Sequence, residues 1–263
     1  MTAGIVTLTE PQFYAFVEDR LDGGGPCRVQ EDLAFAALAG TCVLPNARLF
    51  LMALDDRGAE LTAGGNLNRK FVEVLLDRLQ WQGSDAAEIR AVCKKVNEQD
   101  FVPAMYLHAV SRLAGLVRSE RGRLKLTKKG RELLPDEEAG RLQAVLFRTT
   151  FARYNPSYLD GFDMPEIFAP QISLILYLIE KFCTDWREVG ALMRSVTFPT
   201  KELAAPKHPD LAVAAFEQRV LRYLWWFGLM EKARPAANDD WRQPRLYRKT
   251  ALYDRMLQFM EMR

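Results

Sequence analysis

The stretch DFVPAMYLHAVSRLAGLVRSERGRLKLTKKGRELL, residues 100–134, constrains the fold of this chain more than any other. Apolar residues recur at three- and four-residue steps from Met105 to Val117, which predicts a helix with one buried stripe. Gly115 stands where a left-handed residue would end that helix. The next residues alternate between apolar and basic side chains and turn at Arg121 and Gly122, which predicts a two-stranded hairpin. Thr127 is placed to cap a further helix.

This stretch resembles part of a known family. The run RLAGLVRSERGRLKLTKKGRELL is similar to the segment of winged-helix transcription regulators in which a recognition helix precedes "GLV", a basic hairpin and "LT..G..LL". The resemblance covers roughly residues 61–134 and implies a winged-helix fold, while winged-helix modules that bind no DNA share the same pattern. More loosely, LTAGGNLNRKFVEVLL is similar to segments of uncharacterised bacterial plasmid-type proteins, a likeness that carries no function.

Two helices are predicted ahead of this stretch. Asn66 is the expected N-cap of the first, whose inward side carries Leu67, Phe71, Leu75 and Leu79. Asp85 and Glu88 have the spacing of a capping box and start the second helix. Its expected buried stripe consists of Ile89, Val92, Cys93 and Val96.

The second half of the chain repeats this order of elements. PEIFAPQISLILYLIEKF predicts a buried helix, and TDWREVGALMRSV predicts another in which Trp186 faces inward. A long helix then ends at Gly228, in the role of Gly115. A polar loop between Lys232 and Pro244 predicts an extended wing tip, and RLYRKTALYDRML corresponds to RLKLTKKGRELL.

These elements predict a mainly α fold with small β-hairpins (α+β), in which two winged-helix units pack together after a short N-terminal helical or mixed segment. A length of 263 residues favours two domains over one. Within the N-terminal segment, ARLFLMAL fits a strand or a buried helix turn. The expected divisions are the N-terminal segment at 1–58, the first winged-helix unit at 59–135, a connecting helix and aromatic linker at 136–164, and the second unit at 165–263.

Composition limits the classes of function. Lys and Arg total 36 against 34 Asp and Glu, so the net charge of +2 makes any nucleic-acid affinity depend on a local patch. The apolar run ISLILYLI is shorter than the roughly 20 residues that a membrane-spanning helix needs. With no secretory signal, we expect a cytoplasmic protein without membrane contact. We expect four reduced thiols, no metal and no cofactor, because the following residues lack metal-site spacing: Cys27, Cys42, Cys93, Cys183, His108 and His208.

The sequence holds no recognisable catalytic motif. G-x-S-x-G, H-E-x-x-H and dinucleotide-binding patterns are absent, and no Gly-Lys-Ser/Thr follows the glycines at 23–25, which favours a plain loop over a phosphate loop. His108 and Ser111 share one helical turn and could act as a base and a nucleophile. No carboxylate stands at a readable spacing to orient the histidine, so we expect surface positions and no enzymatic activity.

Two hypotheses of function remain. The first is a nucleic-acid-binding regulator that contacts duplex DNA through its basic wings and the polar sides of its long helices. The second is an interaction scaffold whose winged helices bind a protein partner or a second copy instead, because the long helices are more apolar than those of dedicated DNA readers. The candidate nucleic-acid contacts are His108, Ser111, Arg112, Arg118, Arg121, Arg123, Lys125, Lys128, Lys129, Gln218, Arg219, Arg222, Arg245 and Arg248.

Overall fold

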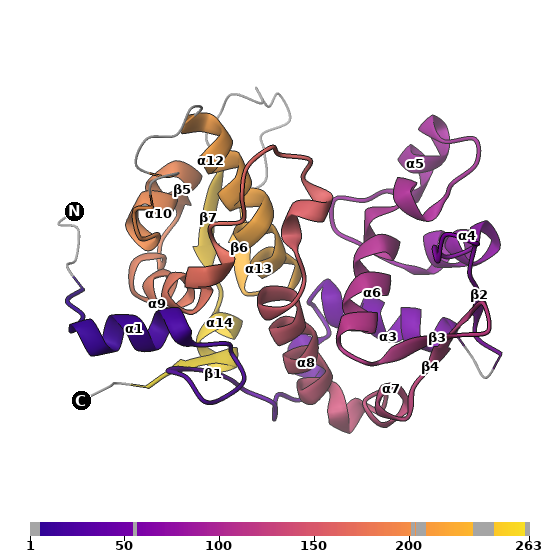
Figure 1. Cartoon of the computed structure of the whole chain (residues 1–263), viewed down its shortest axis with the longest axis horizontal. Helices are drawn as coiled ribbons and strands as arrows, with labels where there is room; N and C mark the ends of the chain where they lie inside the picture. The colour runs from indigo at the N-terminus through magenta and orange to yellow at the C-terminus, as the bar shows by residue number, and fades with distance from the viewer. Residues whose placement is uncertain (1–5, 55–56, 201–202, 204–208, 234–244, 261–263) are drawn as a thin grey trace. The chain divides into compact units, whose positions relative to one another are not determined.

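A computed structural model of the chain describes residues 6–54, 57–200, 203, 209–233 and 245–260 (Figure 1). The chain forms two compact units, which we name for their places in the sequence: the central unit, residues 31–154, and the flanking unit, residues 1–30 and 155–263. Both combine helices with small antiparallel sheets, so the expected α+β class is confirmed. The four-segment division expected from the sequence stays a prediction.

The central unit consists of helices around one three-stranded antiparallel sheet. Its strands lie in the order β2-β4-β3, so β2 pairs with the return strand of the hairpin. The run ARLFLMAL, for which the sequence fits a strand or a buried helix turn, belongs to the buried helix α3. The elements are α2 (Phe35–Leu38), α3 (Val43–Ala53), β2 (Ala59–Glu60), α4 (Arg69–Arg78), α5 (Ala86–Val92), a 3-10 turn (Glu98–Asp100), α6 (Val102–Leu113), β3 (Val117–Glu120), β4 (Arg123–Leu126), α7 (Lys128–Glu132), a 3-10 turn (Asp136–Glu138) and α8 (Ala139–Ala152).

Side-chain caps set where these helices begin. Asp85 starts α5, as predicted, and accepts hydrogen bonds from the backbone N–H groups of Ala87 and Glu88. The prediction of Asn66 as the cap of α4 is wrong, because Leu67 still pairs in extended conformation with Leu61 and Asn68 takes the role. The predicted stripe on α5 is also wrong. The helix ends at Val92, which is 84% exposed, and none of its residues is buried.

The predicted basic hairpin is confirmed, with Arg118 opposite Lys125 and Glu120 opposite Arg123. Gly115 ends α6 with φ +71°, a conformation that favours glycine. Thr127 caps α7 through the N–H of Gly130. A Cβ atom on Gly130 would lie 2.2 Å from the Leu116 carbonyl oxygen, so the "LT..G" pattern reflects a cap beside a close backbone approach.

The flanking unit has a three-stranded antiparallel sheet in the order β5-β7-β6, and a second, two-stranded sheet pairs β1 with β8. The prediction that Trp186 faces inward is wrong: it is 39% exposed and precedes β5, because α10 begins only at Val189. The elements are α1 (Glu10–Glu18), β1 (Cys27–Val29), 3-10 turns (Pro156–Leu159 and Ala169–Gln171), α9 (Ile172–Phe182), β5 (Arg187–Glu188), α10 (Val189–Val196), α12 (Pro209–Phe216), a π-helical turn (Glu217–Leu221), α13 (Arg222–Trp226), β6 (Met230–Lys232), β7 (Leu246–Lys249), α14 (Ala251–Met256) and β8 (Leu257–Phe259).

The two units repeat one hydrogen-bonded device where the long helix meets the hairpin. In the central unit, Leu116 N–H donates to the Ser111 carbonyl at 2.9 Å, and the Thr127 hydroxyl donates to the Gly115 carbonyl at 2.7 Å. In the flanking unit the corresponding bonds run from Leu229 to Leu224 at 2.8 Å, and from Thr250 to Gly228 at 2.7 Å. The expected correspondence of Gly228 with Gly115 is thereby confirmed. The predicted extended wing tip, Lys232 to Pro244, lies largely outside the described residues.

None of the described helices combines the length and the apolar character that crossing a bilayer requires.

Candidate nucleic-acid interface

The tip of the β3–β4 hairpin holds the most unusual backbone position among the candidate residues. Arg121 has φ +50° and Gly122 has φ +73°, so both residues between the strands are left-handed, as in a type I′ turn. Such turns favour Asn, Asp and Gly at the first position, and an arginine there is uncommon. The Arg121 side chain is exposed.

The outward face of the central sheet mixes cations with carboxylates. Arg118 and Lys125 both contact Glu120, at 2.6 and 2.8 Å. The hydrogen bond and charge of Lys125, with the charge of Arg118, lower the pKa of the Glu120 carboxyl. Arg123 pairs with Glu60 at 3.1 Å and also donates to the carbonyls of Arg57 and Gly58. Arg123 and Lys125 are therefore engaged within the sheet, while Arg118, whose side chain is 65% exposed, extends into solvent.

Helix α7 adds two candidate cations next to the hairpin. Lys128 has a side chain that is 91% exposed and lies 3.7 Å from Glu132. Lys129 donates to the Ala114 carbonyl at 2.9 Å and thus closes the end of α6. Of the two, Lys128 is the one whose ammonium group can meet a ligand.

Helix α6 places only one of its three candidate side chains in solvent. Arg112 is exposed, whereas His108 is 7% exposed and Ser111 is fully buried. The prediction of an outer position for His108 and Ser111 is wrong, because the helix buries this side as well as the apolar stripe that runs from Met105 to Val117. A buried side chain does not reach a base edge, so this helix offers little for reading DNA sequence.

His108 has a carboxylate partner that sequence reasoning missed. Its Nδ1 lies 2.7 Å from Glu98 Oε1, and Glu98 Oε2 accepts from the Leu67 N–H at 2.5 Å. Glu98 is itself 5% exposed. The buried carboxylate therefore ties the loop before α6 to the start of α4. A glutamate ten residues before a histidine gives no periodic signal, since the two are brought together by a 3-10 turn and not by one helix.

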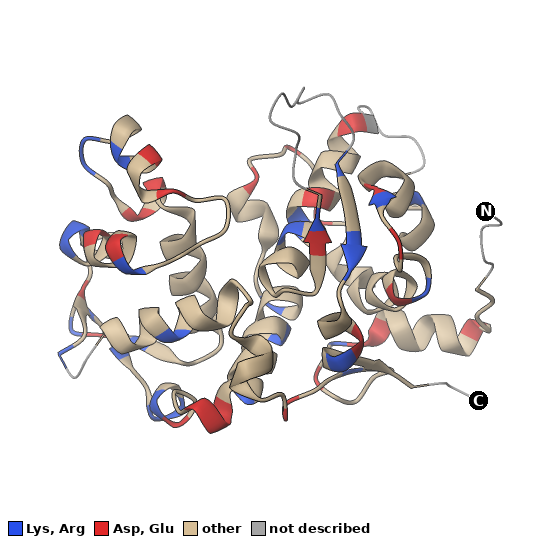
Figure 2. Cartoon of the chain, turned by 180° about the vertical axis from the view of Figure 1, so that it is seen from behind, with Lys and Arg blue, Asp and Glu red and all other residues tan. Residues whose placement is uncertain are grey.

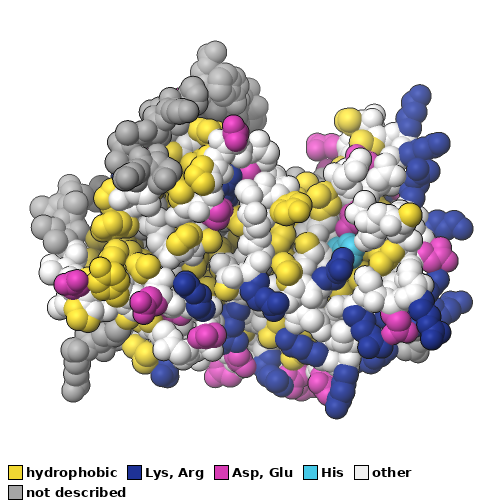
Figure 3. Space-filling model, viewed as in Figure 1, with side chains coloured by type: hydrophobic (Ala, Val, Ile, Leu, Met, Phe, Trp, Pro, Cys, Tyr) yellow, Lys and Arg dark blue, Asp and Glu magenta, His cyan; other side chains and the backbone are white. Residues whose placement is uncertain are grey.

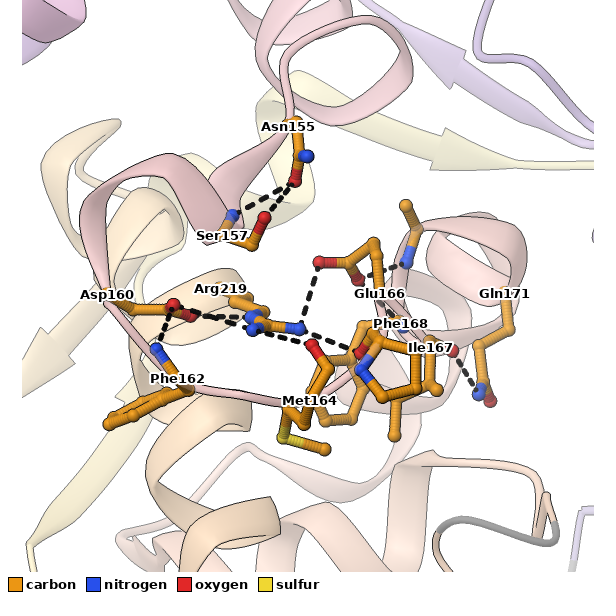
Figure 4. A network of polar contacts seen from close by, with 12 residues as sticks. Asn155, Ser157, Asp160, Phe162, Met164, Glu166, Ile167, Phe168, Gln171 and Arg219 are labelled. Carbon is orange, nitrogen blue, oxygen red and sulfur yellow. Dashed lines mark hydrogen bonds and ion pairs between the residues drawn. The ribbon is translucent and has the colours of Figure 1, made fainter.

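In the flanking unit, Arg219 lies in the interior at the π-helical turn (Figure 4). The side chains of Arg219 and Asp160 are both 0% exposed, and Nε lies 2.5 Å from the Asp160 carboxylate. The guanidinium also donates to the carbonyls of Pro165 and Met164, and Glu166 lies 3.6 Å away. Arg219 thus holds the segment 160–166 in place and cannot reach a ligand.

The remaining candidates of the flanking unit gather at its own sheet and long helix. Gln218 and Arg222 are half-buried, and the Arg222 guanidinium lies 5.1 Å from the ring centroids of both Tyr223 and Trp226. Arg248 lies 4.7 Å over the Trp186 ring and pairs with Glu231.

Arg245 pairs at 2.7 Å with Glu217, a buried carboxylate that also accepts from the Tyr247 hydroxyl. The hydrogen bond that Arg245 donates to the Glu217 carboxylate raises the pKa of the Arg245 guanidinium, which keeps its charge. Arg245 is therefore the one candidate residue of the flanking unit that is exposed, whereas Gln218, Arg222 and Arg248 are half-buried and Arg219 is buried.

The described residues assemble no metal site, and two of their thiols stay protonated. No three of their His, Cys, Asp or Glu side chains gather as they would around a metal ion. None of the four cysteines, which all lie among the described residues, forms a disulfide bond, and burial raises the pKa of the Cys42 thiol to about 12 and that of Cys183 to about 11, so both stay protonated.

Comparison with known proteins finds relatives for the central unit. The family model described as Y4jL N-terminal domain matches residues 39–141. Uncharacterized protein y4jL of Sinorhizobium fredii (strain NBRC 101917 / NGR234) is 32% identical over 82 residues, which are 31% of this chain and 37% of that protein. The expected resemblance to an uncharacterised bacterial protein is confirmed over this region. No solved structure matches the chain.

Proposed function

We propose that this chain is a non-enzymatic tandem winged-helix protein that binds duplex DNA through the basic hairpin of its central unit and acts in transcription regulation. The backbone conformation and exposure of Arg121 are the observation that carries the proposal. This residue is exposed at the hairpin tip in a left-handed conformation that costs a bulky residue free energy. Such strain is retained where the side chain has a task, and a guanidinium at the tip of a wing suits a phosphate.

The architecture of both units supports the winged-helix part of this proposal. Each unit runs from a helix to a short strand, to further helices and then to a hairpin, in the orders β2-β4-β3 and β5-β7-β6. In a winged helix the first strand likewise pairs with the return strand of the wing. The repeated bonds at Gly115 and Gly228 support a tandem arrangement further.

The proposed contacts are the exposed members of the candidate set. Arg112, Arg118, Arg121 and Lys128 lie in solvent on the central unit. We exclude His108, Ser111 and Arg219 as DNA contacts because they are buried. Arg123, Lys125 and Lys129 form hydrogen bonds within the unit that mainly stabilise the hairpin and its ends. Gln218, Arg222, Arg245 and Arg248 form a weaker second set.

The surroundings of His108 do not favour a hydrolase. Glu98, His108 and Ser111 resemble the carboxylate, base and nucleophile of a hydrolase in residue type. Ser111 is fully buried, however, so no substrate carbonyl could approach its hydroxyl.

The test is fluorescence anisotropy with a labelled random duplex at low salt. We expect binding that weakens steeply with salt and that falls in the variant Arg121→Ala/Lys128→Ala. The matched control is Arg141→Ala/Arg153→Ala, which removes two exposed cations from α8 and its end. Equal binding by the two variants would contradict the proposal, as would no binding by the unmodified protein.

The alternative function is an interaction scaffold without DNA binding. It is favoured by apolar side chains left in solvent, among them Val92 at 84% and Tyr158 at 80% exposure. Light scattering after size exclusion would distinguish the two, since a stable dimer without DNA affinity supports the scaffold. The cytoplasmic location stays a prediction under either function.

A further inference from the structure

We infer that the central unit binds the DNA backbone along a basic edge, and that it does so without reading bases. The basic edge comprises Arg69 and Lys70 at the start of α4, Lys94 and Lys95 in the loop after α5, and Arg121 at the hairpin tip. All five side chains are exposed, and none forms an ion pair with any residue that the structure describes. This inference rests on the proposed function and names its contact surface.

The hairpin and the start of α4 are held together by one carboxylate. Glu60 on β2 accepts from Arg123 on one oxygen and from the Asn68 side chain on the other, each at 3.1 Å. The Asn68 N–H also donates to the Glu60 carbonyl at 3.1 Å. Because Asn68 is the N-cap of α4, Arg69 and Lys70 follow as the first two helical residues beside the hairpin.

The loop carrying Lys94 and Lys95 is fixed to the same place from the other side. Glu98, a few residues after this pair, binds the N–H of Leu67, the residue just before the α4 cap. His108 supports Glu98 from within the core. His108 is therefore a positioning residue for the basic edge and does not touch the ligand.

The figures show where Lys and Arg gather on the central unit. In Figure 3, Lys and Arg side chains follow its edge beside α5 and α4 and continue to the hairpin and α7. In Figure 2, seen from behind, Lys and Arg segments again mark α4, the loop next to α5 and the hairpin, with Asp and Glu segments on α4 and α5 among them.

An extended row of cations fits a partner with regularly spaced anions, and the phosphates of duplex DNA provide this spacing. Arg69 and Lys70 also lie at the positive end of the α4 dipole, which adds attraction for a phosphate. Base readout needs donors and acceptors on a helix that enters a groove. Helix α6 presents Arg112 but buries His108 and Ser111, so we expect affinity without sequence preference.

The experiment measures salt-dependent anisotropy on two labelled duplexes of equal length, one AT-rich and one GC-rich. The edge variant is Arg69→Ala/Lys70→Ala/Lys94→Ala/Lys95→Ala. Its slope of log K against log salt should become shallower by about 0.9 for each phosphate that the protein no longer neutralises. The matched control removes four exposed arginines from the flanking unit, with the same change in net charge: Arg28→Ala/Arg187→Ala/Arg194→Ala/Arg255→Ala.

The outcomes separate this inference from the proposed function. If the Arg121→Ala/Lys128→Ala variant loses binding while the edge variant keeps the original slope, DNA contacts the hairpin tip and does not follow the edge along α4 and the loop after α5. The inference is then refuted and the DNA-binding function stands. A preference of about 10³-fold for one duplex would reveal base readout and also overturn the inference. No binding by the unmodified protein refutes both. Should the fourfold variant misfold, Lys94→Gln/Lys95→Gln alters only an exposed loop and should still make the slope shallower.

Discussion

Arg219 is the residue whose loss we expect to destabilise the flanking unit most. Arg219→Met removes the cation that pairs with the buried Asp160 carboxylate, which keeps its bond from the Phe162 N–H, and removes the donor to the carbonyls of Met164 and Pro165. Breaking a buried pair from one side typically costs about 3–5 kcal/mol of unfolding free energy. Urea denaturation followed by circular dichroism measures this loss.

The double variant Asp160→Asn/Arg219→Met is the control for this prediction. It leaves no charge buried without a partner, so it should be more stable than Arg219→Met alone. A double variant that is less stable would show that the charge pair is not the source of the effect. The sequence pattern places Arg219 on the polar side of its helix. It does not reveal the buried partner Asp160, which lies 59 residues earlier and beyond the reach of any helical spacing.

Replacing Arg121 should increase the stability of the central unit. Arg121→Asn places a residue that tolerates the left-handed conformation at φ +50°, so unfolding should cost up to about 1 kcal/mol more. Thermal denaturation of the variant checks this, with Arg118→Asn on the adjacent strand as a control that should show no gain. A loss of stability in Arg121→Asn would mean that the arginine side chain itself stabilises the hairpin.

Among the elements, α5 is held by charge and capping and not by a core. None of its residues is buried, and Arg90 reaches Asp77 at 2.5 Å and Glu73 at 3.3 Å on α4. Exposed ion pairs weaken with salt, so amide hydrogen exchange across 86–93 should speed up in concentrated salt and in Arg90→Ala. Amides of α6, which buries most of its length, serve as the internal control. Unchanged protection of α5 in both conditions would contradict this account.

The contrast between α5 and the hairpin shows which elements could be predicted. The β3–β4 hairpin follows from local alternation and a left-handed turn at Arg121 and Gly122, so its register is contained in a few consecutive residues. The stripe predicted on α5 required Cys93 and Val96 to continue the helix. The helix ends at Val92 instead, because the chain leaves it to place Glu98 against Leu67, a long-range contact that periodicity does not reveal.

For the whole molecule, the repeat of helix and hairpin could be predicted. The assignment of residues 1–30 to the same unit as residues 155–263 could not. Gly115 and Gly228 mark the repeat because both need the same left-handed conformation. Strand β1, residues Cys27–Val29, pairs with β8 near the other end of the chain. Nothing local to Cys27 indicates so distant a partner, since antiparallel pairing depends on the fold as a whole. The candidate interface was likewise predictable at the hairpin and missed at Arg69, Lys70, Lys94 and Lys95, which share no period.

The repeated device leads to a prediction about how the molecule unfolds. Thr127→Val removes a hydroxyl that donates to Gly115 and caps α7, and should cost about 1–2 kcal/mol. Thr250→Val removes the corresponding bond to Gly228 without a side-chain cap and should cost about 1 kcal/mol. Because each unit has its own core, differential scanning calorimetry should resolve two transitions, with Thr127→Val lowering one and Thr250→Val the other. If both variants shifted one shared transition equally, the two units would unfold as a single cooperative body.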